Sequence, residues 1–175
     1  KVALVTGAGQ VLGQCMSVAL AEAGSDIIGL DRTESGQTAE MVRTLGRRYR
    51  PVVCDLRQAT ANDLRGIITS AAAELGRLDI LVNNAGIIRR APALEFSEED
   101  WDDVIHINLR QVFFLSQAAA RVMSEQGSGK IINIASMLSF QGGILVPSYT
   151  AAKSGIAGLT RSLANEWAKL GINVN

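Results

Sequence analysis

The stretch Thr6-Gly7-Ala8-Gly9-Gln10-Val11-Leu12-Gly13 directly follows the short apolar run Val2–Thr6. Glycines in this position allow the backbone to turn tightly from a strand into a helix, whose N-terminus can hold a pyrophosphate. Glycine-rich turns also occur in ordinary loops, so the motif alone is not specific. Its place between the first strand and the first helix favours a dinucleotide-binding fold.

Beyond this turn, short apolar runs alternate with longer stretches of helical periodicity, as in parallel sheets built from strand–helix–strand units. The expected strands are Val2–Thr6, Asp26–Leu30, Pro51–Asp55, Asp79–Asn83 and Lys130–Ala135, with Ile172–Asn175 as a partial sixth. The expected helices are Leu12–Ala23, Ser35–Arg47, Ala61–Leu75, Glu98–Met123 and Tyr149–Leu170. The sequence therefore predicts an α/β fold of the Rossmann type, a doubly wound parallel sheet in three α/β/α layers. We expect a single domain over residues 1–175 whose C-terminal part is missing, because the last residues form a strand that is only beginning.

The composition excludes several classes of protein. With 47% hydrophobic and 19% charged residues, the chain has the makeup of a packed domain rather than a disordered one. Lys plus Arg and Asp plus Glu both total 17, and this zero net charge argues against a nucleic-acid binder. No apolar run reaches the roughly 18 residues of a membrane span, and no signal peptide is recognisable. These features predict a cytoplasmic protein with a small-molecule partner.

Potential metal ligands are sparse, because Cys15 and Cys54 form no CxxC motif and His106 is the single histidine. We expect no bound metal, and two small buried thiols in a reducing compartment. The acidic run that follows Ser97 has the pattern of a capped helix start rather than of a metal site. The basic run at residues 47–50 is interpreted as a solvated helix end rather than an anion site.

Two acidic residues follow predicted strands. Asp31 ends the second strand, 18 residues after Gly13, where a carboxylate can accept hydrogen bonds from ribose hydroxyls. A carboxylate there repels a 2′-phosphate and favours NAD over NADP, whereas the neighbouring Arg32 could bind that phosphate. Asp55 holds the same place after the third strand. For both acids, a simple strand-end or capping role is the alternative.

Tyr149 and Lys153 are four residues apart at the start of a predicted helix, so their side chains share one face. A phenol, with an ordinary pKa of ~10, is a poor base near neutral pH. A cation about 4 Å away stabilises the phenolate by on the order of 4 kcal/mol at an effective dielectric constant near 20. Ser136 ends a predicted strand 13 residues before Tyr149 and can reach the same crevice. An exposed amphipathic helix face is the alternative for the Tyr–Lys pair.

These features together resemble the short-chain dehydrogenase/reductase family over essentially the whole chain. The matching residues are the Thr6–Gly13 turn, Asn83-Asn84-Ala85-Gly86, Asn108, Ser136, Tyr149 and Lys153. The resemblance implies that Tyr149 is the acid/base, that Lys153 assists it and holds the nicotinamide ribose, and that Ser136 orients the substrate. It also implies that Asn108 holds a proton-relaying water, although a polar residue that caps or kinks its helix is the alternative. The expected cofactor-binding residues are Gly7, Gln10, Leu12, Gly13, Asp31, Asp55, Leu56, Asn83, Ala85, Gly86 and Lys153.

Within the family, the chain is most similar to sugar-acid dehydrogenases of the 2-deoxy-D-gluconate 3-dehydrogenase and gluconate 5-dehydrogenase types. The similarity lies in the stretches at residues 83–90, 136–143 and 146–150. Arg89 and Arg90 follow a loop expected at the catalytic crevice, and a guanidinium can pair with a carboxylate through two hydrogen bonds. We hypothesise that one of them binds the acid group of the substrate, with Gln141 bonding a sugar hydroxyl. An adjacent arginine pair in a loop can also simply be solvated.

One residue departs from the family pattern, since position 11 is Val where a glycine is usual. If that backbone needs a positive φ, a β-branched residue is a poor occupant.

The first hypothesis for the function is an NAD-dependent sugar-acid dehydrogenase. An NADPH-dependent 3-oxoacyl thioester reductase, and a non-catalytic dinucleotide-binding protein disabled at Val11, are the alternatives. The resemblance further implies a homotetramer, although the apolar positions of the last helix are equally compatible with packing on the sheet.

Overall fold

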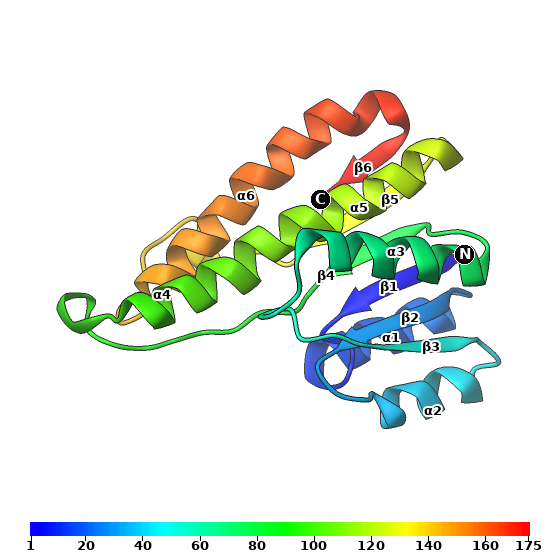
Figure 1. The fold of residues 1–175 in the computed structure, drawn as a ribbon, viewed down its shortest axis with the longest axis horizontal. Coiled ribbons are helices and arrows are strands. Elements are labelled where there is room, and N and C mark those ends of the chain that lie inside the picture. Colours follow the sequence, from blue (N-terminus) through cyan, green and yellow to red (C-terminus); the bar gives the residue numbers. More distant parts are fainter.

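The computed structural model describes residues 1–175 as a single parallel sheet with helices packed on it (Figure 1). The strands are β1 (Val2–Thr6), β2 (Asp26–Asp31), β3 (Tyr49–Val53), β4 (Ile80–Asn83), β5 (Gly129–Asn133) and β6 (Ile172–Val174). The helices are α1 (Val11–Glu22), α2 (Gly36–Thr44), α3 (Ala61–Leu75), α4 (Glu98–Ile105), α5 (Gln111–Gln126) and α6 (Pro147–Trp167).

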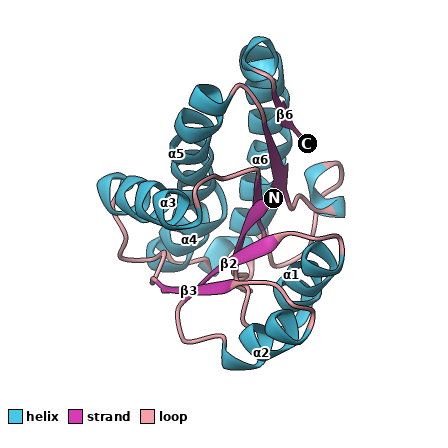
Figure 2. Cartoon of the chain, turned by 90° about the vertical axis from the view of Figure 1, so that its right-hand side faces the viewer, coloured by secondary structure: helices cyan, strands magenta, loops and turns pink.

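The strand order is β3-β2-β1-β4-β5-β6, and every neighbouring pair is parallel. From β1 the chain adds β2 and then β3 on one side. It then crosses back and adds β4, β5 and β6 on the other side of β1. Because such crossovers are right-handed, α1 and α2 lie on one face and α3, α5 and α6 on the other (Figure 2). The predicted doubly wound sheet is confirmed. The order reverses between β1 and β4, and in this fold a ligand binds beyond the carboxyl ends of the strands at that point.

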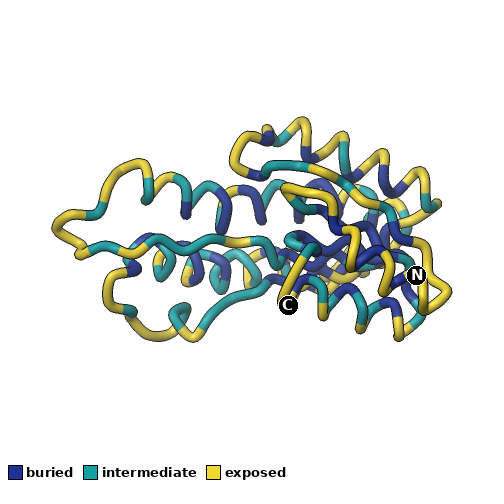
Figure 3. Tube along the Cα trace, turned by 90° about the horizontal axis from the view of Figure 1, so that it is seen from below, coloured by how far each residue is buried: buried dark blue, intermediate teal, exposed yellow.

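The core lies along the central strands, where all five residues of β1 are buried. Its largest cluster holds 22 buried residues, including Leu4, Ile28, Leu81 and Ile131. Figure 3 shows the buried parts of the chain in dark blue, gathered in the interior of the fold. Burial alternates along β5 and β6, so only one face of this half of the sheet is covered. Ile132 on the other face is 38% exposed. The central strands therefore give the site a rigid base, while the β5–β6 half is covered on one side only.

Two sequence predictions about local structure need correction. The predicted helix Glu98–Met123 is interrupted by a π-helical turn at His106–Arg110, which separates α4 from α5. The third strand begins at Tyr49 rather than at residue 51, so Arg50 belongs to β3 and not to a helix end. Arg50 forms an ion pair with Glu74, and its backbone pairs with β2. The prediction failed here because Arg47, Arg48 and Arg50 gave the start of the strand the polar pattern of a solvated helix end.

The predicted N-cap is confirmed, because the Ser97 hydroxyl accepts a hydrogen bond from the Asp100 N–H over 3.1 Å. The prediction of buried thiols is wrong, since Cys15 is exposed on α1 and Cys54 is half-buried. None of the helices combines the length and the apolar character that crossing a membrane requires.

Candidate active site

The Thr6–Gly13 turn, called the phosphate turn below, joins β1 to α1. At two of its positions, Gly7 and Gly13, any other residue would force the backbone to shift. Gly7 has φ +67°, and its N–H donates to the Leu30 carbonyl over 2.8 Å. Gly13 lies in the first turn of α1, where an added Cβ would stand 1.9 Å from the Gly7 carbonyl oxygen. That approach is far inside van der Waals contact, so the turn closes only with glycine at position 13. The result is the exposed helix N-terminus that a pyrophosphate needs.

Asp31 braces this turn from the end of β2. One carboxylate oxygen accepts the Gly9 N–H over 2.8 Å, and the other accepts the Arg32 N–H over 2.7 Å. The Thr38 hydroxyl adds a hydrogen bond to the Ala8 carbonyl over 2.9 Å. Asp31 therefore supports the turn structurally, in addition to its predicted contact with a ribose. In either role its carboxylate lies next to the turn.

A cavity of about 370 Å³ opens beside the turn at the carboxyl ends of β1, β2 and β4. Its walls include nine of the predicted cofactor residues, namely Gly7, Gln10, Leu12, Gly13, Asp31, Asp55, Leu56, Ala85 and Gly86. The other wall residues are Val11, Leu30, Arg32, Cys54, Arg57, Asn84, Ile87 and Ile107, of which sequence reasoning missed Leu30, Cys54, Arg57, Ile87 and Ile107. Several of these are direct neighbours of predicted residues, and this adjacency was the signal that could have found them.

Asn83 does not line this cavity, in contrast to the sequence prediction. It is buried, and its amide nitrogen donates to Ser116 over 3.0 Å and to Asn133 over 2.9 Å. The next residue, Asn84, faces the turn instead and donates to the Thr6 carbonyl over 3.0 Å. Successive strand residues point to opposite sides, so a motif of two asparagines places only one of them at the site.

Tyr149 and Lys153 lie in the first turns of α6 and face one another. The Lys153 Nζ is 5.7 Å from the centroid of the Tyr149 ring. Lys153 is only 5% exposed, and its amine donates to the Ile134 carbonyl at the end of β5. Burial lowers the pKa of Lys153, so this amine releases a proton more readily than an exposed lysine. The predicted shared face of the two side chains is present, although Lys153 does not line the cavity beside the turn.

Ser136 follows β5 and begins a short 3₁₀ turn at Met137–Ser139. Its hydroxyl accepts the Leu138 N–H over 3.2 Å. In the same turn, the Ser139 hydroxyl donates to the Lys153 carbonyl over 2.7 Å, which fastens the turn to α6. Through this bond the segment that carries Ser136 is held against the helix that carries Tyr149. Gln141 is exposed in the loop that follows.

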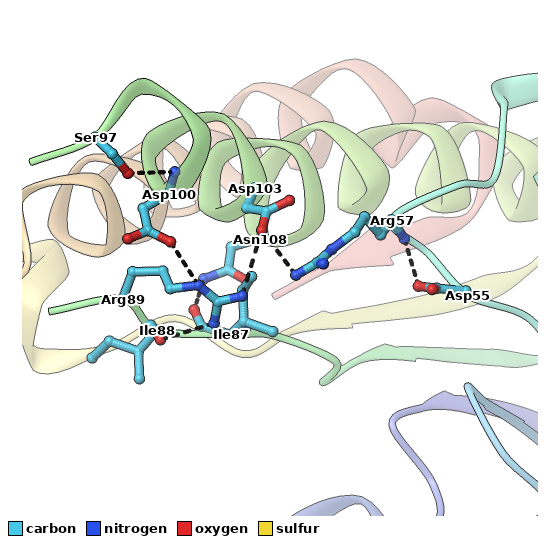
Figure 4. Close-up of polar contacts among 9 residues, drawn as sticks. All are labelled: Asp55, Arg57, Ile87, Ile88, Arg89, Ser97, Asp100, Asp103 and Asn108. Atoms are coloured by element: carbon cyan, nitrogen blue, oxygen red, sulfur yellow. Dashed lines mark hydrogen bonds and ion pairs between the residues drawn. The ribbon is translucent and has the colours of Figure 1, made fainter.

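Asn108 lies in the π-helical turn and is fully buried. Its Oδ1 accepts the Ile87 N–H over 2.8 Å, and its Nδ2 donates to the Ile87 carbonyl over 2.7 Å (Figure 4). The side-chain amide thus holds the loop after β4 by both of its polar groups. This holding role was not predicted from the sequence. The π-helical turn is a common feature of functional sites, because it displaces one residue from the regular helix.

The two arginines of the hypothesised carboxylate site differ in their surroundings. Arg89 is paired, with its Nε 2.9 Å from Asp100 and its Nη2 3.4 Å from Asp103 (Figure 4). Arg90 is exposed and forms no ion pair. The next residue, Ala91, donates its N–H to the Leu145 carbonyl over 3.1 Å, close to the start of α6. Arg90 therefore has an unpaired guanidinium on a segment that is hydrogen-bonded to the loop just before α6.

The whole chain, residues 1–175, matches the family model described as short chain dehydrogenase. The chain is a short-chain dehydrogenase. It is 58% identical over 176 residues to 2-dehydro-3-deoxy-D-gluconate 5-dehydrogenase of Escherichia coli K12, covering 100% of this chain and 69% of that protein. It is 52% identical to the Bacillus subtilis 168 protein of the same name, with 100% and 68% covered. This short-chain dehydrogenase is thus an NAD(P)-dependent oxidoreductase that acts on CH–OH groups.

Solved structures support the fold of this short-chain dehydrogenase. A protein from Agrobacterium tumefaciens with bound NADP is 50% identical, with a TM-score of 0.90, over 100% of this chain and 69% of that one. An NAD⁺-bound xylitol dehydrogenase is 34% identical, with a TM-score of 0.95, over 100% and 68% of the two chains. The residues of this dehydrogenase fit such a dinucleotide, because the glycine cradle, the helix N-terminus and the adjoining cavity occur together.

Val11 carries the strain that the sequence suggested. It is the first residue of α1, has φ +48° and is 73% exposed at the edge of the cavity. A β-branched side chain in the left-handed region costs about 1–2 kcal/mol, and glycine avoids this cost. Val11→Gly should therefore raise the free energy of unfolding of the dehydrogenase without ligand by about 1 kcal/mol and tighten dinucleotide binding. Urea unfolding and binding titrations measure the two effects.

Val18→Gly is the matched control for this prediction. It makes the same exchange in the same helix, where φ is not positive, and it should destabilise the protein because helix-interior glycine is unfavourable. Equal destabilisation by both substitutions would show that Val11 is not strained.

Proposed function

We propose that this dehydrogenase moves hydride between NAD(H) and a secondary alcohol or ketone of a small sugar acid. Support comes from the identity of 58% to a 2-dehydro-3-deoxy-D-gluconate 5-dehydrogenase. The observation within the chain that carries the substrate class is the unpaired Arg90. It stands on a segment that is hydrogen-bonded beside the start of α6. A free guanidinium at this place suits a substrate carboxylate, which pairs with arginine through two hydrogen bonds.

In this proposal Tyr149 is the acid/base and Lys153 its electrostatic partner. In oxidation, the phenolate takes the hydroxyl proton of the substrate, and bound NAD⁺ supplies the hydride acceptor. The ammonium of Lys153 stabilises the phenolate, and its burial keeps water from screening this attraction. Ser136 orients the substrate oxygen, Gln141 bonds a sugar hydroxyl, and Lys153 also holds the nicotinamide ribose. Asn108 supports the site through the loop it holds and through a relaying water.

We further propose NAD as the preferred cofactor. Asp31 keeps a negative charge beside the phosphate turn, where it disfavours a 2′-phosphate. The opposing feature is Arg32, whose exposed side chain also lines the cavity. Dissociation constants for NADH and NADPH, measured by fluorescence, decide between the two, and tighter NADPH binding would reverse this preference.

A substrate panel tests the function. Purified protein is assayed with NAD⁺ and NADP⁺ for oxidation of gluconates, deoxy- and dehydro-gluconates and neutral polyols. Reduction of 3-oxoacyl thioesters is assayed as consumption of NADH and NADPH. Turnover of a sugar acid with NAD supports the proposal. Turnover of thioesters with NADPH would replace it with reductase activity. Dinucleotide binding without any turnover would identify a non-catalytic protein instead.

Replacing Arg90 by Met should raise the KM for a sugar acid by about 10- to 100-fold, because a charged hydrogen-bonding partner worth about 1.5–3 kcal/mol is lost. A neutral polyol of the same carbon skeleton is the control substrate, and its KM should not change. If the two KM values rise together, Arg90 acts on the site as a whole and does not bind the carboxylate.

The oligomeric state and the location in the cell are also part of the proposal. We propose a cytoplasmic homotetramer, on the resemblance to the family and on the composition. Sedimentation of the purified protein tests the first point, and a monomer would contradict it.

A further inference from the structure

Three segments that are distant in the sequence meet at the carboxylate of Asp103 on α4 (Figure 4). The Arg57 Nη2 lies 2.8 Å from Asp103 Oδ2, and the Arg89 Nη2 lies 3.4 Å from the same oxygen. The Asp103 side chain is 16% exposed, so water screens these pairs less than it screens an open surface pair. One carboxylate thus holds two arginines from two different loops.

Arg57 belongs to one wall of the dinucleotide cavity. It stands in the loop between β3 and α3, and its N–H donates to Asp55 Oδ1 over 2.9 Å. Asp55, Leu56 and Arg57 all line the cavity. The ion pair to Asp103 therefore fixes this wall to α4, which is separated from it in the chain by α3 and β4.

Arg89 belongs to the segment that forms the opposite wall. Gly86 and Ile87 line the cavity, and Ile87 is held by both polar groups of Asn108. Two residues further on, Arg89 binds Asp100 and Asp103, which face it from successive turns of α4. Arg89 itself does not line the cavity.

We propose that Asp103 is a positioning residue that ties the two walls of the dinucleotide cavity together, so that Arg89 affects cofactor affinity without touching the cofactor. The proposal rests on the cofactor site described above, and it does not depend on the substrate. Loss of the shared carboxylate leaves Arg57 without an ion pair, while Arg89 keeps only its pair with Asp100. Both loops then gain freedom that cofactor binding must remove, which weakens binding.

The experiment measures the dissociation constant for NADH by fluorescence titration, with the circular dichroism of each variant as the folding check. Asp103→Asn should raise this constant about 5-fold, as expected for the loss of a partly shielded charge pair. Asp102→Asn is the matched control, because this neighbouring acid is exposed and forms no ion pair. Its dissociation constant should equal that of the unmodified protein.

A double-mutant cycle separates positioning from a general loss of structure. Arg89→Met should weaken NADH binding in the unmodified protein and have a smaller effect in Asp103→Asn, where only the pair with Asp100 is left to lose. Asp103→Glu keeps the charge and should restore part of the affinity. If Asp103→Asn does not fold, the cycle between Arg57→Met and Arg89→Met takes its place, and non-additive effects support the proposal.

Additive effects, or equal affinities of Asp103→Asn and Asp102→Asn, would overturn the positioning role and leave the dehydrogenase function intact. Absence of NADH and NADPH binding in the unmodified protein would overturn the cofactor site, and this inference with it.

Discussion

Replacing Tyr149 by Phe should lower kcat/KM by about 10³-fold, the usual contribution of a positioned general acid or base. The exchange removes one oxygen from the residue that faces Lys153 across 5.7 Å and leaves the ring in place. The glycine turn and the cavity beside it do not involve this hydroxyl, so NADH affinity should stay unchanged. Steady-state kinetics and a fluorescence titration measure the two quantities.

Tyr49→Phe is the matched control, since the chain has only two tyrosines. The Tyr49 hydroxyl is buried between β3 and its neighbours, away from Lys153, and burial raises the pKa of this phenol. Its removal should therefore leave turnover unchanged. If Tyr149→Phe keeps more than about a tenth of the activity, the loss is too small for removal of a general acid or base. Another group would then have to carry the proton.

Replacing Gly13 by Ala should destabilise the protein by about 3 kcal/mol, the upper range for overpacking a closed site. The added methyl group would stand 1.9 Å from the Gly7 carbonyl oxygen and 2.8 Å from the Asn84 amide nitrogen. Because the first of these neighbours is backbone, the turn itself must move. The variant should therefore also lose measurable NADH binding. Urea unfolding gives the stability, and titration gives the affinity.

Gly66→Ala provides the comparison for this prediction. Gly66 lies within α3, and an added Cβ there meets no atom within 4 Å. Alanine favours a helix over glycine by about 1 kcal/mol, so this variant should gain stability. If Gly13→Ala is as stable as the unmodified protein, the close approach of Gly13 to Gly7 is not required, and the explanation of the turn is wrong.

The architecture could be read from the sequence because it depends on local spacing. Short continuous apolar runs, typical of buried parallel strands, and helices with a period near 3.6 are set by residues close to one another in the chain. The same holds for Tyr149 and Lys153, which share a helix face through their separation of four. The strain at Val11 was also predictable, because the turn type requires a positive φ whatever packs around it.

Errors in the prediction of the site arose where long-range contacts decide. Asn83 and Asn84 have the same chemistry, but strand alternation and the partner Ser116, 33 residues away, turn Asn83 into the core. The exposure of Cys15 depends on which face of α1 meets the sheet. Strand alternation shows only that the two asparagines differ. Which of them faces the core, and which face of α1 meets the sheet, depends on the tertiary packing.

The sequence by itself determined the order of strands and helices, the glycine turn and the Tyr–Lys pair, since each of these follows from bond geometry over a few residues. Only the tertiary structure decided that Arg89 is neutralised by Asp100 and Asp103 while Arg90 stays free. Adjacent arginines look identical in a sequence. Their charges are distinguished only when folding brings carboxylates from another element within hydrogen-bonding distance of one and not of the other.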